Sequence, residues 1–469
     1  MIHSKRSFKL LASVLVSIVI YALPVPNGLS EQAWHLFAIF LGTITLVMTG
    51  VFAMGAASLM GLTAALLCRL MSFQEAFSGF TSPITWLILS AFFISFGLVH
   101  TGLGRRIALW FVARFGKNIL GLAYGIGITE LLLAPGTPSS TARTGGIIYP
   151  VVDSIARSFN SLPHSKSAAK IGSYLILCLF NFSVVSSAMF MTAMAANPFA
   201  ARLAQSNNIE VSWGSWALYA LVPGIINLLL IPIILLKLVP PEIRDTSDAV
   251  NNAKQELETL GAMKSPERLM ALGFVLLMLL WVLGPLIKLD AVVAALLGLS
   301  FLLIMNVVKW EQLLKLHSAF ETFIWFGALL ALAEGLTKSG FTSWFGELVA
   351  FHMGGLPMLL GVSLLVLVYF YAHYFFASCT AHVGALFSPF LMGAIALGAL
   401  PLPTALALLY ASSLFGSLTH YGIGPAPILF GAGYVTLGAW WRIGFLMSIA
   451  TLIIWGISAP LWWAFLGVF

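Results

Sequence analysis

Two short polar tripeptides interrupt apolar segments of this chain, and their residue types suit the binding of an anion. The first tripeptide is Ser139-Ser140-Thr141, and the second tripeptide, Ser378-Cys379-Thr380, lies 239 residues further on. Small hydroxyl side chains beside a helix N-terminus can donate hydrogen bonds to a carboxylate, together with free backbone N–H groups and the helix dipole. The turn-forming run Pro135-Gly136-Thr137-Pro138 can end one helix before the first tripeptide begins the next. We therefore expect all six residues to bind an anionic ligand.

The spacing of 239 residues extends beyond the tripeptides. The further pairs are Trp86 and Trp325, Ala142 and Ala381, Gly145 and Gly384, and Pro150 and Pro389. A pattern repeated at half the chain length indicates an internal repeat. In membrane transporters such repeats place paired broken helices around one substrate site near the bilayer midplane.

The residues that follow the tripeptides are potential cations. Arg143 and His382 occupy the same place in the two copies. A charge at membrane depth costs about 2.5–3.5 kcal/mol, so it needs a partner or a function. We expect both side chains to contact the anion; the alternative for Arg143 is an interfacial position or an ion pair with Glu130 or Glu334.

A second polar break follows each tripeptide, and in both breaks Thr and Pro stand six residues apart. The first runs from Thr192 to Pro198 and includes Asn197, and the second runs from Thr419 to Pro425. Proline removes a backbone donor, so the carbonyls before it are free to face an ion, a substrate or water. We predict that Thr192, Asn197, Thr419 and Pro425 belong to the site; a simple kinked span is the alternative.

The elements that position these residues are membrane helices. With 60% apolar residues, 8% charged residues and a mean hydropathy of +0.99, the chain is an all-α polytopic membrane protein. We expect about eleven spans plus two re-entrant hairpins. The apolar stretches, which include 8–23, 52–67 and 291–306, outnumber the spans because several are shorter than the roughly 20 residues that a span needs. The net charge of +7 reflects basic loops that set topology, so we expect no nucleic-acid partner. The three cysteines make no metal spacing and imply no disulfide framework.

Basic residues near the start predict the orientation. Lys5, Arg6 and Lys9 precede the first apolar run and place the N-terminus in the cytoplasm. A cleaved signal peptide is the competing interpretation, but the run ends without a small-x-small cleavage site.

The chain divides at one long polar stretch, 237–268, which we interpret as a cytoplasmic linker with a short helix near 249–260. The first span, within 1–30, lies outside the repeat. The first repeat covers 31–236 with a hairpin near 139–160, and the second covers 269–469 with a hairpin near 378–399. Five spans in each repeat, an odd number, would invert the second copy.

Several motifs resemble the divalent anion/sodium symporter family, and the resemblance covers nearly the whole chain. They are Pro138-Ser139-Ser140-Thr141-Ala142-Arg143-Thr144-Gly145-Gly146, Pro240-Pro241-Glu242 and Ser417-Leu418-Thr419-His420-Tyr421-Gly422-Ile423-Gly424-Pro425-Ala426-Pro427. The nearest branch holds citrate/succinate and tartrate/succinate antiporters and chloroplast 2-oxoglutarate/malate translocators. The resemblance implies an elevator-type carrier of di- or tricarboxylates, usually a homodimer, in the plasma (inner) membrane.

The chain departs from the family's Ser-Asn-Thr motif at its central position. Ser140 and Cys379 replace Asn, and a thiol is a poor ligand for a hard cation. Ser139, Ser140, Ser378 and Thr380 are therefore only weak sodium-site candidates. We predict exchange without sodium, with Arg143 and His382 compensating the dianion. The alternative is sodium- or proton-coupled symport, with Glu130 or His420 carrying protons.

An intramembrane enzyme and a channel are the other classes we considered. His373, His382 and His420 could serve as metal ligands or bases, but their spacing matches no metal or catalytic motif. A channel is disfavoured because Gly- and Pro-broken repeats suit alternating access. We expect a transporter that is not an enzyme and has no cofactor.

Overall fold

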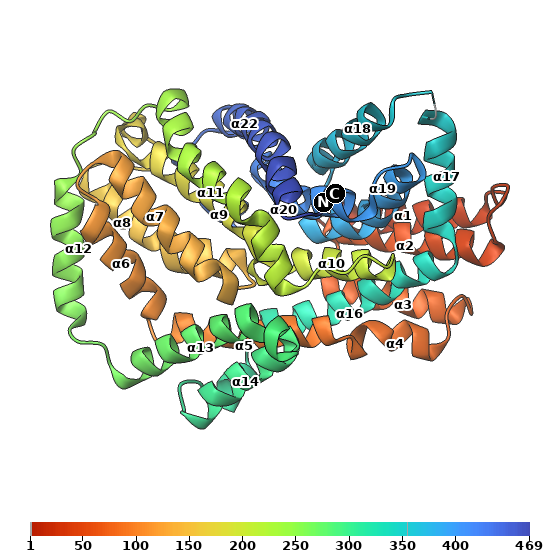
Figure 1. Cartoon of the computed structure of the whole chain (residues 1–469), viewed down its shortest axis with the longest axis horizontal. Helices are drawn as coiled ribbons and strands as arrows, with labels where there is room; N and C mark the ends of the chain where they lie inside the picture. The colour runs from red at the N-terminus through yellow and green to blue at the C-terminus, as the bar shows by residue number, and fades with distance from the viewer. Residues whose placement is uncertain (1, 354) are drawn as a thin grey trace.

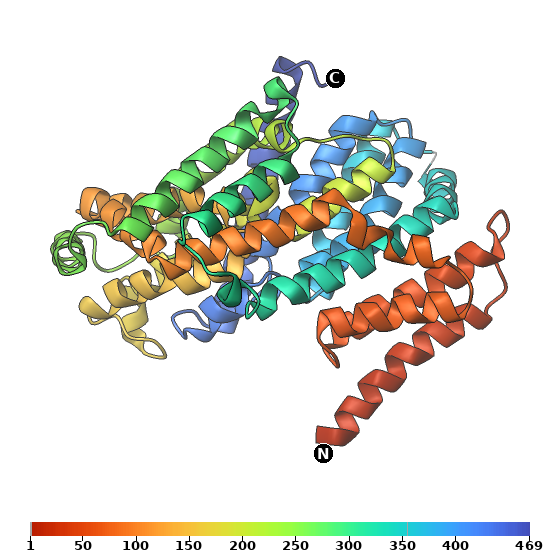
Figure 2. The same ribbon diagram turned by 90° about the horizontal axis from the view of Figure 1, so that it is seen from below.

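The computed structural model describes residues 2–353 and 355–469. The regular elements of these residues are helices, and one isolated bridge joins Asn118 to Asp245. Side chains are described from residue 9 onward except at 285 and 354, so Lys5 and Arg6, on which the predicted orientation partly rests, lie outside them. Figures 1 and 2 show an elongated bundle in which α1 (Ile2–Ala22) packs against α2 (Glu31–Thr49).

The helices form two series with a similar order of elements. The first continues from α2 with α3 (Met54–Leu67), α4 (Phe73–Thr81), α5 (Pro83–His100), α6 (Leu103–Phe115), α7 (Ile119–Leu133), η1 (Ala134–Gly136), η2 (Thr141–Ile148), α8 (Tyr149–Ser158), η3 (Lys166–Lys170), α9 (Gly172–Met189), η4 (Met191–Ala193), α10 (Ala196–Ser206) and α11 (Trp213–Leu238). The second has α13 (Ser265–Ile287), α14 (Ala291–Ile304), α15 (Trp310–Leu313), α16 (His317–Lys338), α17 (Phe341–Met353), α18 (Met358–Tyr371), η5 (Ala372–Phe375), α19 (Cys379–Ala396), α20 (Pro401–Leu414), η6 (Phe415–Ser417), α21 (Ala426–Gly431) and α22 (Leu437–Phe465). The orders differ in that η2 and α8 of the first correspond to the single helix α19 of the second, and η3 has no counterpart among the described residues.

Short 3₁₀ turns mark the same places in both series. The turns η1 and η5 lie just before the two tripeptides, whereas η4 and η6 follow α9 and α20. The helix α12 (Ser247–Leu260) stands between the series and packs along α6, where Arg105 pairs with Glu256 at 2.8 Å. The short helix predicted within the linker is therefore present.

Ten helices among the described residues are long and apolar enough to cross a membrane. They include α18, α19 and the stretch Ile119–Gly136, the elements that flank the tripeptides. The apolar segment Lys9–Ala22 and the helices α3 and α14 have 14 residues each, fewer than the roughly 20 that a perpendicular span needs. The structure confirms a polytopic all-helical protein, with ten candidate spans among the described residues where about eleven were expected.

Matched elements of the two series pack against each other. Contacts join α9 to α20, α11 to α22 and α5 to α16, while α10 lies against α19. Helix α4 approaches α16 so closely that a Cβ on Gly79 would stand 2.0 Å from the Gly327 carbonyl oxygen, so a glycine is required there. The two series therefore share one core.

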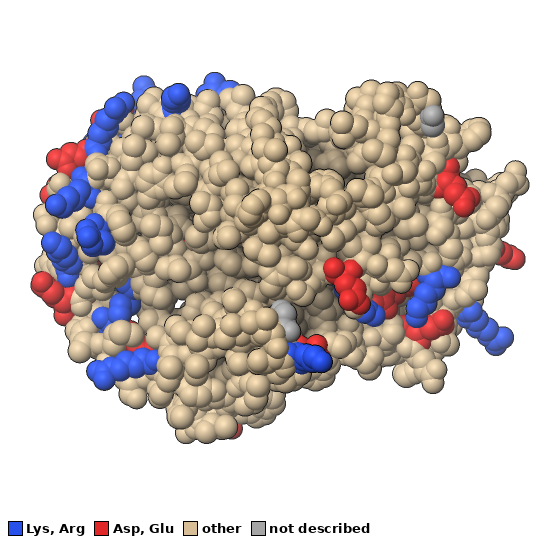
Figure 3. Space-filling model, in the orientation of Figure 1, with Lys and Arg blue, Asp and Glu red and all other residues tan. Residues whose placement is uncertain are grey.

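Charged side chains on the face that Figure 3 shows gather mainly in two groups. Figure 3 shows Lys and Arg gathered at the end where Figure 1 places α6, α8 and α12, a second mixed group near the other end, and a broad uncharged face between them. Such a face suits lipid contact, and basic residues concentrated at one end suit a fixed orientation in the bilayer.

Candidate substrate site

The first tripeptide caps a helix. The proline-containing turn η1 ends the preceding helix, and Ser139 Oγ accepts a hydrogen bond from the Ala142 N–H at 3.2 Å. The Ser139 carbonyl accepts from the Arg143 N–H at 3.0 Å. The helix that follows begins as the π-helix η2, a rare geometry found often at functional sites.

The second tripeptide repeats this cap. Ser378 Oγ accepts from the Ala381 N–H at 3.3 Å, and its carbonyl accepts from the His382 N–H at 3.1 Å. Here the helix is α-helical from Cys379 onward. At both positions a serine, whose short side chain can accept a hydrogen bond from the first turn of the helix, is the N-cap residue.

A cavity of about 330 Å³ lies between the two tripeptides. Its lining consists of Met54, Phe92, Pro138, Ser139, Ser140, Thr141, Met194, Ala195, Ala196, Ala377, Ser378, Cys379, Thr380, Tyr421, Gly422, Ile423, Gly424 and Pro427. We call this space the tripeptide cavity. All six residues predicted from the tripeptides therefore line one space, although the chain separates them by more than two hundred positions.

The tripeptide cavity suits a carboxylate anion. Several helices begin at its wall, among them the one starting with η2, α10 and α19. Their N-terminal N–H groups and dipoles attract negative charge. Among the lining residues described, Asp, Glu, Lys and Arg are absent, so no carboxylate repels an anion. The hydroxyls of the two tripeptides can add further hydrogen bonds.

Arg143 does not line the tripeptide cavity, which corrects the predicted contact with the anion. Its side chain is fully buried behind the first tripeptide, where Nε donates to Glu130 Oε1 at 2.9 Å. Nη1 donates to the carbonyls of Thr137 at 2.9 Å and Ala193 at 3.0 Å, and Nη2 donates to Ser187 Oγ at 2.9 Å. A buried guanidinium requires this pairing, so the Glu130 alternative holds.

His382 also lies outside the cavity lining, which corrects its predicted contact with the anion. Its Nδ1 stands 3.1 Å from Nδ1 of His373, and its ring stacks on Phe415 at 4.4 Å between centroids. His373 Nε2 lies 3.1 Å from the Gly422 carbonyl oxygen. A carbonyl only accepts, so this nitrogen of His373 carries the proton.

The residues predicted at the second breaks surround the cavity without lining it. Thr192 Oγ1 donates to the Pro135 carbonyl at 2.5 Å. Asn197 is buried, donates to the Ser187 carbonyl at 2.7 Å and accepts from Ser413 Oγ at 2.7 Å. Thr419 and Pro425 are buried beside the wall that Gly422 and Gly424 form. The hydrogen bonds of Thr192 and Asn197 stabilise the first break, whereas the buried Oγ1 of Thr419 has no hydrogen-bond partner among the described residues.

Some wall residues gave no usable signal in the sequence. Met54 and Phe92 are apolar residues in a chain that is 60% apolar, so nothing marks them. Behind the wall, the contact of His373 with Gly422 depends on tertiary packing across 49 positions, which the sequence does not predict. The charged partner Glu130 was named as a possibility, and its position confirms that pairing.

Known proteins resemble this chain along nearly its whole length. The family model described as "Sodium:sulfate symporter transmembrane region" matches residues 4–469. "Dicarboxylate transporter 1, chloroplastic" of Spinacia oleracea is 47% identical over 463 residues, covering 98% of this chain and 81% of that protein. "Putative malate transporter YflS" of Bacillus subtilis (strain 168) is 43% identical over 460 residues, covering 98% and 96%.

Two more comparisons extend this likeness. "Citrate/succinate antiporter" of Escherichia coli (strain K12) is 35% identical over 466 residues, covering 94% of this chain and 95% of that protein. The crystal structure of the Alcanivorax borkumensis YdaH transporter has a TM-score of 0.51 with 15% identity, covering 98% of this chain and 97% of that one. That likeness concerns the fold. The family match and the relatives together show that this chain belongs to the sodium:sulfate symporter transmembrane family of membrane transporters, and that it is not an enzyme.

Proposed function

We propose that this protein exchanges di- or tricarboxylate anions across the membrane without sodium. The relatives named as dicarboxylate, malate and citrate/succinate transporters support the substrate class. The tripeptide cavity supports it physically, because it offers hydroxyls and helix N-termini and, among its described lining residues, no acidic side chain. Ser139, Ser140, Thr141, Ser378, Cys379 and Thr380 are the proposed substrate-binding residues.

The observation that carries the sodium-free proposal is the position of the Arg143 guanidinium. Nη1 donates to two carbonyls that have no helical partner because the helices break there. They are the carbonyls of Thr137, in the turn before the first tripeptide, and of Ala193, in η4. Hard cations bind such oxygens when no donor occupies them. A side-chain cation held there takes the place of a bound ion and needs no sodium gradient.

An imidazole makes the corresponding contact in the second half. His373 donates through Nε2 to the carbonyl of Gly422, a residue of the cavity wall. His382 supports that ring from behind. The weak sodium-site candidates of this half, Ser378 and Thr380, therefore stand beside a carbonyl that a side chain already binds.

Obligatory exchange follows from the electrostatics of an empty cavity. Without an anion, the helix N-termini and the hydroxyls of the cavity wall would cross the membrane interior with weaker solvation than in water. A bound carboxylate satisfies these groups and lowers the cost of the crossing. The loaded form therefore moves more readily than the empty form.

We also propose the finer architecture of an elevator carrier. The two series of elements, 31–236 and 269–469, would be inverted repeats around the 237–268 linker, with residues 1–30 outside them. The tips near 139 and 378 would be those of re-entrant hairpins. The linker and N-terminus would be cytoplasmic, in the plasma membrane, and the carrier would form homodimers. Support comes from the repeated order of helices and 3₁₀ turns.

Counterflow in proteoliposomes tests the substrate class. Vesicles loaded with one unlabelled anion are given labelled malate, with succinate, fumarate, 2-oxoglutarate, tartrate and citrate as internal partners. We expect accumulation only with carboxylate partners, and no accumulation with sulfate or an empty lumen. Accumulation into empty vesicles driven by a sodium or proton gradient would instead establish the symport alternative. Failure with every carboxylate would refute the substrate class.

A further inference from the structure

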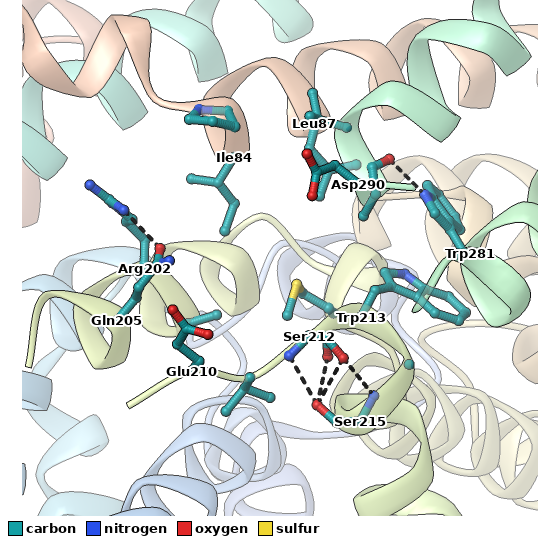
Figure 4. A pocket seen from close by; sticks show the side chains of 18 of the residues that line it. Ile84, Leu87, Arg202, Gln205, Glu210, Ser212, Trp213, Ser215, Trp281 and Asp290 are labelled. Carbon is teal, nitrogen blue, oxygen red and sulfur yellow. Dashed lines mark hydrogen bonds between the residues drawn. The ribbon is translucent and has the colours of Figure 1, made fainter. Parts of the chain in front are cut away.

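A second hollow, larger than the tripeptide cavity, opens between α10–α11 and the group α5, α13 and α14 (Figure 4). Its volume is about 810 Å³, within the usual range for sites of small organic ligands. We call it the interfacial crevice. The residues that determine its chemistry are Ser82, Arg202, Glu210, Trp213, Trp281, Lys288 and Asp290.

The interfacial crevice is distinct from the tripeptide cavity. On α5, Leu87 lines the crevice, whereas Phe92 lines the cavity. Near η4, Met191 lines the crevice and Met194 the cavity. The two hollows therefore lie on either side of the polar break that begins at Thr192. The proposed exchange makes no use of the crevice.

The charges of the interfacial crevice disfavour a second carboxylate substrate. Arg202 is already bound, with Nε 2.7 Å from Glu334 Oε1. The other charged residues of the crevice lining are Lys288, Glu210 and Asp290. No described residue forms an ion pair with any of these three. Figure 4 shows Glu210 and Asp290 on opposite walls of the opening. One cation against two carboxylates favours a ligand with an ammonium group and a single phosphate.

The floor and the surroundings of the crevice are apolar. The rings of Trp213 and Trp281 stack with centroids 5.1 Å apart. Helix α13 beside the opening exposes a run of apolar side chains, namely Leu279, Val282, Leu283, Leu286 and Ile287. In a membrane these side chains contact acyl chains, whereas the two Trp rings are buried in the floor of the crevice.

One wall residue lacks a partner. Ser82 Oγ is buried, with 7% of the residue exposed, and makes no hydrogen bond. A buried hydroxyl without a partner loses free energy relative to a bonded one. An ester or glycerol oxygen of a ligand in the crevice would satisfy it.

We propose that the interfacial crevice binds one phospholipid with a primary-amine, zwitterionic headgroup, namely a phosphatidylethanolamine. Its ammonium lies between Glu210 and Asp290, its phosphate contacts Lys288, an ester oxygen meets Ser82, and its acyl chains follow α13. The lipid would fill the gap between two groups of helices. This proposal stands independently of the proposed exchange.

Native mass spectrometry of the full-length protein tests the proposal. The protein is reconstituted with equal amounts of phosphatidylethanolamine, phosphatidylcholine and phosphatidylglycerol, and the retained lipid is identified. We expect one retained phosphatidylethanolamine, with phosphatidylcholine weaker because a quaternary ammonium has no N–H to donate. The double variant Glu210→Gln/Asp290→Asn should retain about tenfold less, the loss expected for charge-assisted hydrogen bonds.

A matched control neutralises two exposed carboxylates elsewhere. Asp248→Asn/Glu258→Gln, on α12, should retain the lipid like the unmodified protein. Lys288→Gln, which removes the proposed phosphate contact but keeps both carboxylates, should weaken retention while preserving the preference for the amine. Preferential retention of phosphatidylglycerol, equal retention of all three lipids, or an unchanged Glu210→Gln/Asp290→Asn variant would overturn the proposal.

Discussion

At the scale of single residues, the cation that follows the first tripeptide supports the site from behind. Arg143 uses Nε, Nη1 and Nη2 for contacts inside the protein, with Glu130, Ser187 and two backbone carbonyls. Thr144 adds a hydrogen bond to the same Glu130 oxygen at 2.6 Å. The ion pair therefore fixes the backbone of the turn before the first tripeptide, and so the positions of the tripeptide hydroxyls.

Breaking this pair should destabilise the protein strongly. We expect Glu130→Gln to lower the free energy of unfolding by about 3–5 kcal/mol, because a buried guanidinium is left without its counter-charge. The double variant Glu130→Leu/Arg143→Met should recover much of that stability but lose sodium-free exchange. Thermal denaturation in detergent, followed by exchange assays, measures both effects.

The control for this experiment is an exposed pair. Arg157→Gln removes the contact with Asp153, in which the arginine side chain is 51% exposed, and should change stability by less than about 1 kcal/mol. Unaltered stability of Glu130→Gln would contradict the structural role of the pair. Undiminished exchange in the double variant would remove Arg143 from the mechanism.

The capping serines give a second prediction at this scale. Ser378→Ala removes both the N-cap bond to Ala381 and a hydroxyl of the cavity wall, so the KM for the carboxylate should rise about tenfold. Ser300→Ala is the control, because Ser300 is exposed and bonds only to its own helix. An unchanged KM for Ser378→Ala would exclude this hydroxyl from binding.

At the scale of elements, α10 connects the cavity to the rest of the bundle. It begins at the cavity wall with Ala196, and one turn or more later Arg202 binds Glu334 of α16 at 2.7 Å. Glu334 is largely buried, with 8% of its side chain exposed. This ion pair is a direct charged contact between a cavity-forming helix and a helix of the other series.

If α10 moves past α16 during transport, this ion pair must break in each cycle. We expect Glu334→Gln to change the exchange rate severalfold while leaving the KM nearly constant, because the pair does not touch the cavity. Stopped-flow exchange of wild type, Arg202→Gln, Glu334→Gln and the double variant gives the coupling energy. Arg105→Gln, which removes the exposed pair with Glu256, is the control. Additive effects of the two variants would contradict a functional coupling.

The repeated tripeptides and proline-containing breaks predicted the cavity-forming segments well, because Ser, Pro and Gly determine caps and turns locally. The sequence did not predict the π-helical start of η2, which has no distinct propensity. It also misplaced Arg143 and His382. Side-chain direction at the third or fourth residue of a helix depends on packing, and here both point away from the cavity toward Glu130 and His373.

At the scale of the whole molecule, two series of helices share one core and enclose one cavity from both sides. Membership in the sodium:sulfate symporter transmembrane family gives the class of carrier. The side chains of Arg143 and His373, which bind backbone carbonyls at the helix breaks, favour exchange without sodium over sodium-coupled symport. The central claim is therefore that exchange proceeds without an inorganic cation.

Exchange in proteoliposomes with choline in place of sodium tests this claim most directly. Purified protein is reconstituted into malate-loaded vesicles, and uptake of labelled 2-oxoglutarate is followed at a fixed pH with sodium from zero to saturating concentrations. Empty vesicles serve as the control for uptake without a partner anion. We predict equal initial rates in sodium and in choline, and almost no uptake into empty vesicles. A steep rise of the rate with sodium, or equal uptake into empty vesicles, would contradict the account.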